Sequence, residues 1–427
     1  MNKAYLLSAI LGLCAASAAA QYTQPLDSVP SRALVLTGDT SHPAQLHNIA
    51  ELYSRLNLAF EDPAAPRFLF LDKKGEVALG IGGYVKATGM YDFMGAINNN
   101  GFVTNEIPVP LNPAQRNRFG ATANHSTIFL KLVTSPTKFG RVIVYVQTNF
   151  TGDNGGYGLK MKQAYVTVGH VTAGLARSTF SDAPAMAPTV DDQGPSGQVT
   201  AKQMLVQYVS PSYGGFSYAL SAELPSASYT LAAGTEAISQ RCPDIPAYIQ
   251  YAWNKGASHV RVSALLCQLS YRDVISGHNH FSTGWGVQFS TIAQLGAGFS
   301  FFGHYTYGKG IGHYINDFDG EGLDLVPDYN EPGKLKAPGM TGLTAGLQYD
   351  ITKDLFVSAS YSRAQLYNSK CMGEGTERYS QYIVANMFYN VWGDLRFGLE
   401  YVHGTRKDLS GLSGKASRVE AMLQYSF

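Results

Sequence analysis

Lys160 and Lys162 occupy alternate positions of one predicted strand, and Leu159 and Met161 occupy the opposite face. Side chains at alternate positions of a strand share a face. A lysine that faced lipid near the middle of a bilayer would cost about 2–4 kcal/mol. If this strand crosses a membrane, both lysines must therefore point into an aqueous interior. Positive charge there raises the local concentration of small anions.

Further basic residues flank this pair in the sequence. They are Arg116, Arg118, Lys131, Arg141, Arg177 and Lys202. We predict that Arg118, Lys160, Lys162, Arg177 and Lys202 line a passage for solutes. The alternative is that these charges lie at the rims of the protein or pair with nearby acidic side chains.

A long segment, residues 178–197, follows Arg177 and contains three prolines that restrict its backbone. Its acidic residues are Asp182, Asp191 and Asp192. A loop in solvent needs no such rigidity, whereas a loop that folds inward to narrow a passage does. We predict that this segment is a constriction lined by its aspartates. An ordinary outer loop is the alternative.

The C-terminal residues show the clearest strand pattern of the chain. Val419, Ala421, Leu423, Tyr425 and Phe427 alternate with Arg418, Glu420, Met422, Gln424 and Ser426. One face is apolar and the other mostly polar, which is typical of a strand with lipid outside and water inside. We predict that Leu423, Tyr425 and Phe427 form the signal that the barrel-assembly machinery recognises.

From about residue 75 onward, the same two-residue period recurs. Short and long connections alternate: short ones near 135–138, 169–172, 211–214, 255–257, 291–294, 351–354 and 391–393, long ones near 93–117, 151–157, 179–199, 225–243, 272–280, 308–338, 366–376 and 405–415. This alternation is typical of bacterial outer-membrane barrels. We predict an all-β fold, a transmembrane antiparallel β-barrel of about 16 strands with short periplasmic turns and long extracellular loops, wide enough to hold water.

Three regions are expected along the chain. Residues 1–20 resemble a secretory signal peptide, with Lys3, a short apolar run and a small-residue cleavage site. We therefore expect export to the outer membrane of a Gram-negative bacterium. Residues 21–74 are predicted to be a periplasmic extension with a short helix, either packed against the barrel rim or a neighbouring subunit, or loosely ordered. Residues 75–427 are predicted to be the barrel.

The composition agrees with a barrel in lipid. Aromatic residues make up 12% of the chain and charged residues only 15%, against about 25% in soluble proteins. Without residues 1–20, basic and acidic residues balance, so nucleic acid is not an expected partner. Cys242, Cys267 and Cys371 match no zinc motif, and any disulfide among them is left open. We predict no cofactor and no metal.

Three stretches resemble DcaP-like outer-membrane porins of the Bacteroidota type. They are GIGGYVKATGMYDF (residues 80–93), FEDPAAPRFLFLDKKGEVALGIGGYVK (60–86) and LKMKQAYVTVGHVTAGLARSTFSDAPAMAPTVDDQGPSG (159–197). The resemblance implies a homotrimer that passes small organic anions, dicarboxylates among them. Arg177 and Asp182 match the motif, whereas Lys162 stands where the family tends to have arginine. Lysine cannot grip a carboxylate through two parallel hydrogen bonds as arginine does.

Other functions are weighed against a passive porin. An outer-membrane receptor or adhesin would act through its long loops, notably 308–338. A barrel-embedded hydrolase would use a histidine near the outer loops, namely His278, His280, His304, His313 or His403. No motif fixes any of them, so we do not expect an enzyme. A soluble all-β secreted protein would also alternate, but it would purify without detergent.

Overall fold

The computed structural model describes residues 30–37, 43–54, 58–63, 65–97, 100–152, 156–328, 330–331, 333–367 and 372–427. The expected signal peptide and Cys371 lie outside these residues.

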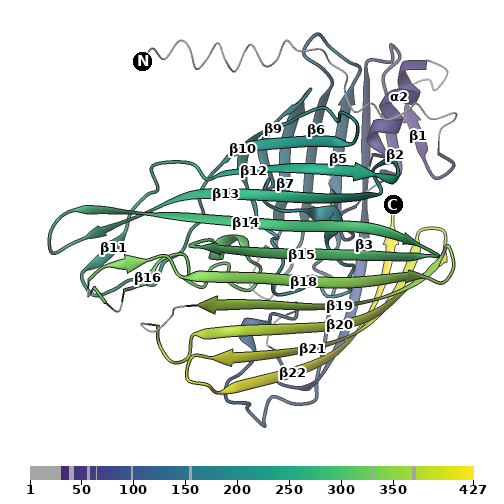
Figure 1. The fold of residues 1–427 in the computed structure, drawn as a ribbon. Helices are drawn as coiled ribbons and strands as arrows, with labels where there is room; N and C mark the ends of the chain where they lie inside the picture. The colour runs from purple at the N-terminus through teal and green to yellow at the C-terminus, as the bar shows by residue number, and fades with distance from the viewer. Residues whose placement is uncertain are drawn as a thin grey trace, which may run out of the picture.

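The described chain forms a closed wall of sixteen antiparallel strands, which confirms the predicted fold class (Figure 1). β4 and β5 both pair with β3 and together make one wall strand. The wall strands are β3 (Val77–Met94), β4 (Arg118–Thr122) with β5 (Thr127–Thr134), β6 (Val142–Asn149), β7 (Lys160–Val168), β8 (Val171–Arg177), β9 (Lys202–Val209), β10 (Phe216–Glu223), β12 (Ile245–Trp253), β13 (Ser258–Asp273), β14 (Asn279–Gly296), β15 (Phe299–Lys309), β18 (Gly339–Asp350), β19 (Leu355–Tyr367), β20 (Glu377–Trp392), β21 (Leu395–Asp408) and β22 (Ser413–Ser426).

The wall closes where the last strand meets the first. β22 runs antiparallel to β3, from Ser417 opposite Met94 to Ser426 opposite Tyr84. Phe427 continues the ladder: its N–H donates to the carbonyl of Gly83, and the Gly83 N–H donates to the Phe427 carbonyl, at 2.9 and 2.8 Å. Closure leaves no strand edge of the wall in lipid, where an unpaired backbone group would cost several kcal/mol.

The two faces of the wall differ as the alternation predicts. On β14, Val287 and Phe289 are exposed outward, whereas Gln288 and Ser290 are buried inside. On β22, Leu423 is exposed and Arg418 is fully buried. The outward residues of neighbouring strands form a continuous apolar belt, and a belt of this size requires lipid. None of the described helices has the length and apolar character needed to cross a bilayer.

One predicted turn was misplaced. The sequence suggested a turn at 291–294, but β14 continues to Gly296 and the reversal occurs at Ala297 and Gly298. Both residues have positive φ, 49° and 82°, which a tight hairpin turn requires. Polar Thr291 and Gln294 had suggested a turn. Thr291 instead donates to the carbonyl of His259 inside the wall.

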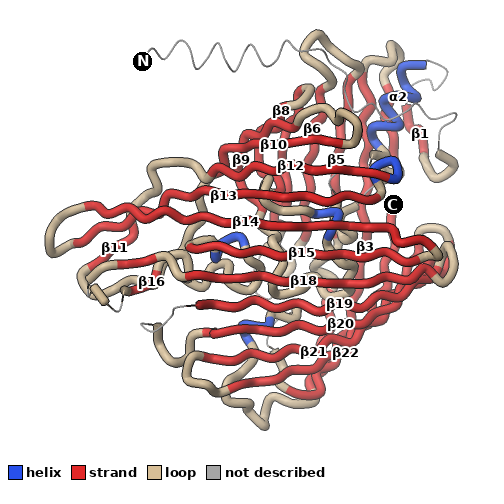
Figure 2. The backbone as a smooth tube through the Cα atoms, viewed as in Figure 1, coloured by secondary structure: helices blue, strands red, loops and turns tan. Residues whose placement is uncertain are grey.

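The remaining short elements lie at the two ends of the barrel or inside it. β1 (Leu34–Thr37), α2 (Pro43–Leu52) and β2 (Phe68–Leu71) lie at the short-turn end, with the C-terminus. The long-loop end carries β11 (Thr235–Ala237), β16 (Val326–Pro327) and β17 (Leu335–Lys336), and η3 (Asn254–Gly256) forms a short turn. The short helical turns η1 (Thr104–Glu106), η2 (Ala183–Ala185) and η4 (Gly312–Tyr314) pack inside the wall. Figure 2 shows the strands curved around an interior that holds loops and short helical turns.

α2 packs onto the short-turn end of the wall. Its apolar residues Ile49 and Leu52 are fully buried against β2, β3 and β5. Two basic residues hold it there: Lys131 donates to the carbonyl of Glu51 at 2.6 Å, and Arg141 donates to the Asn48 side-chain oxygen at 2.6 Å. Lys131 and Arg141 therefore fix the N-terminal region and lie away from the central loops.

The close approach of β3 and β5 makes a prediction about two glycines of β3. A Cβ on Gly83 would lie 2.1 Å from the Thr127 carbonyl oxygen, whereas a Cβ on Gly89 would meet nothing within 4 Å. We expect Gly83→Ala to cost about 1–3 kcal/mol, because the added methyl forces β3 away from β5. The folded band on unheated gels should then be lost at a lower temperature. Gly89→Ala is the matched control, and equal effects from both variants would contradict the expected clash between β3 and β5.

Candidate functional site

Four chain segments enter the barrel and pack on its inner wall. They are the entry segment (residues 58–63), residues 100–107, the constriction loop (178–197) and residues 311–325. Phe60 of the entry segment contacts the rings of Phe356 and Phe388, with centroids 5.8 and 4.9 Å away. Phe102 packs on Tyr382, at 6.0 Å. Of these four segments, only the constriction loop was predicted from the sequence to lie inside the barrel.

The constriction loop is fastened near Val190 to two strands on either side of β22. Lys86 of β3 donates to the carbonyl of Val190 at 2.8 Å. On β21, which is separated from β3 by β22, the Glu400 carboxyl group accepts hydrogen bonds from the N–H groups of Val190 and Asp191, at 2.7 and 3.0 Å. This part of the loop cannot swing out without losing several buried hydrogen bonds.

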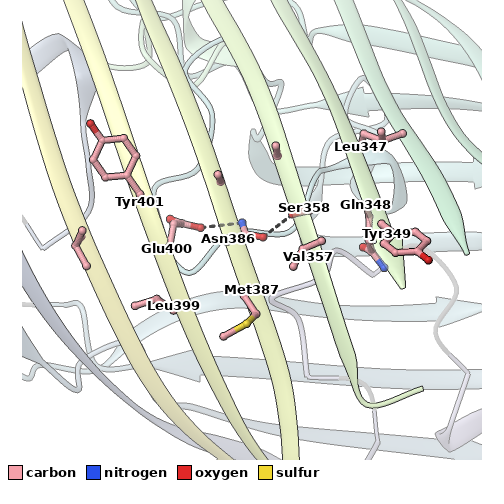
Figure 3. A pocket seen from close by; sticks show the side chains of 13 residues that line it. Leu347, Gln348, Tyr349, Val357, Ser358, Asn386, Met387, Leu399, Glu400 and Tyr401 are labelled. Carbon is pink, nitrogen blue, oxygen red and sulfur yellow. Dashed lines mark hydrogen bonds between the residues drawn. The ribbon is translucent and has the colours of Figure 1, made fainter. Parts of the chain in front are cut away.

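Figure 3 shows a stretch of the wall that has polar side chains on its inner face and apolar side chains on its outer face. Glu400, Asn386 and Ser358 form a hydrogen-bonded row on three neighbouring strands, with distances of 3.0 and 2.5 Å. Leu399 and Leu347 belong to the opposite face and line a shallow apolar groove. The row also reaches the loop, because Asn386 donates to the Pro188 carbonyl at 2.8 Å.

Asp182 anchors the start of the loop. It is fully buried and contacts His259 at 2.8 Å, Ser290 at 2.5 Å and Arg261 at 3.5 Å. Burial alone would raise the pKa of Asp182, but the charges of Arg261 and His259 outweigh burial and hold that pKa below its ordinary value. Its carboxylate faces the wall, and it does not line an open passage as the sequence suggested.

Asp191 has the same anchoring role at the far end of the loop. Its carboxylate accepts hydrogen bonds from the N–H groups of Phe102, Gln193 and Gly194 and from the hydroxyl of Tyr382. The side chain is buried, so it ties the constriction loop to residues 100–107 and to β20. Asp191 is thus a structural residue of the loop and does not line the passage.

Asp192 differs from these two anchors. It pairs with Lys86 at 2.8 Å and lies 3.5 Å from His125, and its side chain keeps some exposure. The sequence analysis did not select Lys86 or His125. The inward position of Lys86 could have been predicted, because Lys86 has the same parity as Tyr84 and Thr88 on β3.

The basic residues of β7, β8 and β9 gather on one side of the lumen. Arg177 and Lys202 are register partners on β8 and β9. Lys162 of β7 lies within electrostatic reach of Lys160 and Arg177. Among the described residues, Lys160, Lys162 and Lys202 form no ion pair within 4.0 Å. We call Lys160, Lys162, Arg177 and Lys202 the basic cluster.

The entry segment brings the countercharge to this cluster. One guanidinium nitrogen of Arg177 lies 2.8 Å from Glu61 and 2.9 Å from Asp62. Burial would raise the pKa of Asp62, but Arg177 and Lys202 outweigh it and lower that pKa. The role of Glu61 and Asp62 could not be predicted from neighbouring residues, because Arg177, which they contact, lies more than a hundred residues further along the chain.

Arg118 does not belong to the basic cluster. It is exposed near the long-loop end of β4, opposite Asp92, and donates to the carbonyl of Ile97 at 2.7 Å. Arg118 lies opposite Asp92, six residues along β3 from Lys86, so it is away from the contact that Lys86 makes with the constriction loop. Arg116 is likewise exposed beside it.

The comparisons agree with this geometry. Residues 75–393 match the porin subfamily, and the chain belongs to this family of outer-membrane channels. No curated protein matches the sequence. The outer-membrane channel DcaP of Acinetobacter baumannii is similar in structure, with a TM-score of 0.73 at 20% identity, over 84% of this chain and 99% of that one. OmpT of Vibrio cholerae is similar at a TM-score of 0.51 and 9% identity, over 84% of this chain and 100% of that one. The expected DcaP-like fold is thus confirmed.

The loop anchors predict the behaviour of a Glu400 variant. Glu400→Ala leaves two buried N–H groups without their acceptor, at about 1–3 kcal/mol each. We expect the constriction loop to loosen, so single-channel recordings should show higher open-channel noise and a larger mean conductance. Glu374→Ala, at an exposed position in an outer loop, is the control. Unchanged currents in Glu400→Ala would show that the loop is held by other contacts.

Proposed function

We propose that this porin allows passive diffusion of small hydrophilic solutes and favours small organic anions, dicarboxylates among them. The observation that carries this proposal is the basic cluster, in which three lysines have no ion-pair partner among the described residues. Unpaired lumenal cations concentrate anions beside the constriction loop. The selectivity should be mild, because lysine offers a point charge and no planar fork for a carboxylate.

The cellular arrangement is part of this proposal. The short-turn end, with α2 and both described termini, would face the periplasm, and the long loops would face outward. Residues 1–20 would be removed as a signal peptide, and residues 21–74 would form the periplasmic extension. Leu423 and Tyr425 point outward near the end of β22, where the barrel-assembly machinery would bind them with Phe427. A homotrimer is proposed on the resemblance to DcaP-like porins.

The alternatives gain little support from the described residues. A receptor acting through 308–338 needs that loop outside, but Phe318, Leu323 and Leu325 are buried inside the barrel. Of the histidines considered for a hydrolase, His304 and His313 are buried. His278, His280 and His403 keep some exposure, but none of the three forms an ion pair with a carboxylate within 4.0 Å among the described residues. A soluble protein could not expose the apolar belt of the wall.

Charge reversal in the basic cluster tests the anion preference. The double variant Lys160→Glu, Lys162→Glu should lower the anion-to-cation permeability ratio by about tenfold, because the local potential changes by one or more kT. The reversal potential in a KCl gradient across a planar bilayer measures this ratio. Lys353→Glu is the control, because that lysine is exposed in a short turn. A ratio that moves equally in both variants would refute a selectivity role for the cluster.

Neutralising the entry segment should have the opposite effect. In the double variant Glu61→Gln, Asp62→Asn, Arg177 loses both countercharges, and we expect anion permeability to rise severalfold.

The Asp62–Arg177 pair also makes a prediction about the effect of pH. Because the pKa of Asp62 is lowered on folding, the pair stabilises docking of the entry segment above the ordinary carboxyl pKa of 3.8. This contribution is lost as the pH falls through the folded-state value.

Cleavage of the entry segment by a protease would show that this segment leaves the barrel when the pH falls below the folded-state pKa of Asp62. The doubly neutral variant serves as the reference, since its docking should not change with acid over the same range. Identical pH profiles in the two proteins would argue against the ion pair.

A further inference from the structure

Asp244, Cys267 and His313 meet in the buried interior near the long-loop end. Each is at most 3% exposed, and their ligand atoms (carboxylate oxygen, Sγ and imidazole nitrogen) all lie within 4.8 Å of one another. They come from three separate parts of the chain: the residue before β12, the middle of β13, and η4. The site lies apart from the basic cluster and plays no part in the proposed solute passage.

The histidine is oriented as a metal ligand would be. Its Nδ1 lies 2.8 Å from the Asp324 carboxylate, which also accepts the Ser228 N–H at 2.8 Å. A carboxylate on one imidazole nitrogen fixes the tautomer and leaves the other nitrogen to bind metal. That other nitrogen, Nε2, faces Asp244 at 3.1 Å.

A second observation favours a cation-binding role for this cluster. Oδ1 of Asp244 is buried and has no hydrogen-bond partner among the described residues. The fully buried carboxyl groups of Asp244, Asp324 and Glu223 face only one ion-pairing side chain within the described chain, His313. Burial of unbalanced carboxylates in an apolar cluster is costly, and a dication would offset it.

We propose that Asp244, Cys267 and His313 bind a structural Zn²⁺ ion. Thiolate, imidazole and carboxylate together are the donor set that zinc prefers in proteins. Zinc bonds of about 2.0–2.3 Å place tetrahedral ligands about 3.3–3.8 Å apart, so small side-chain shifts would complete the site. The fourth ligand is water or Glu223, whose backbone pairs with that of Asp244.

The bound ion would join residues 311–325 to the wall and steady the constriction loop beside them. The hydroxyl of Tyr314, next to His313, lies 3.1 Å from Asp244, and its ring contacts Phe180 of the constriction loop at 5.6 Å. The Glu223 carboxyl group accepts a hydrogen bond from the N–H of Thr179 at 2.8 Å.

The arrangement of Cys267, His313 and Asp324 also resembles a nucleophilic triad, but its complete burial leaves no access for a substrate.

Cobalt substitution of the full-length protein in detergent tests this site. After chelation and dialysis, Co²⁺ should give a sulfur-to-cobalt charge-transfer band at about one ion per barrel, and Zn²⁺ should abolish the band by competition. The band should persist in Cys242→Ser, since Cys242 is exposed and free, and disappear in Cys267→Ser. Zn²⁺ should raise the unfolding temperature of the wild type but not of Cys267→Ser.

A further variant keeps the test decisive if Cys267→Ser does not fold. Asp324→Asn retains the three ligands, and we expect it to bind Co²⁺ about 10–100-fold more weakly with the band intact. The proposal is overturned if the wild type shows no charge-transfer band, if Cys267→Ser keeps it, or if Asp324→Asn binds as tightly as the wild type. Any of these results would leave the cluster as an ion pair without metal.

Discussion

The structure depends on one constraint: a backbone polar group in lipid must find its partner within the protein. The pairing of β22 with β3 meets this constraint by joining the two ends of the wall, and the Phe427–Gly83 pair carries the ladder to the last residue. Closure then fixes which side chains meet water. Because side chains alternate along each strand, Arg418 and Glu420 must lie inside when Leu423 and Tyr425 lie outside.

The interior follows from the size of this wall. Sixteen strands enclose more space than their own side chains fill, so parts of the chain itself enter. Buried acids hold these parts in place: Asp182 and Glu400 fasten the constriction loop to separate parts of the wall, and Asp62 fastens the entry segment to Arg177. The lysines of β7 and β9 remain beside them without ion-pair partners among the described residues.

Much of the fold could be predicted from sequence, because period-two alternation and connection length are local signals. The turn at Ala297 and Gly298 was missed because polar residues before it resembled a turn. The site was predicted less well. Lys160, Lys162, Arg177 and Lys202 lie together, since neighbouring strands place them so, but Asp182 and Asp191 anchor a loop and Arg118 lies at the rim. Glu61, Asp62 and the Asp244–Cys267–His313 cluster depend on contacts between distant parts of the chain, which no local pattern encodes.

The proposed function requires a water-filled passage beside Lys160, Lys162 and Lys202, which form no ion pair within 4.0 Å among the described residues. Recording the wild-type protein in a planar bilayer under a KCl gradient tests this most directly. We predict stable single-channel currents and a reversal potential of the sign that indicates greater permeability to chloride than to potassium. A barrel that inserts but carries no current, or a reversal potential that indicates strong preference for potassium, would contradict it.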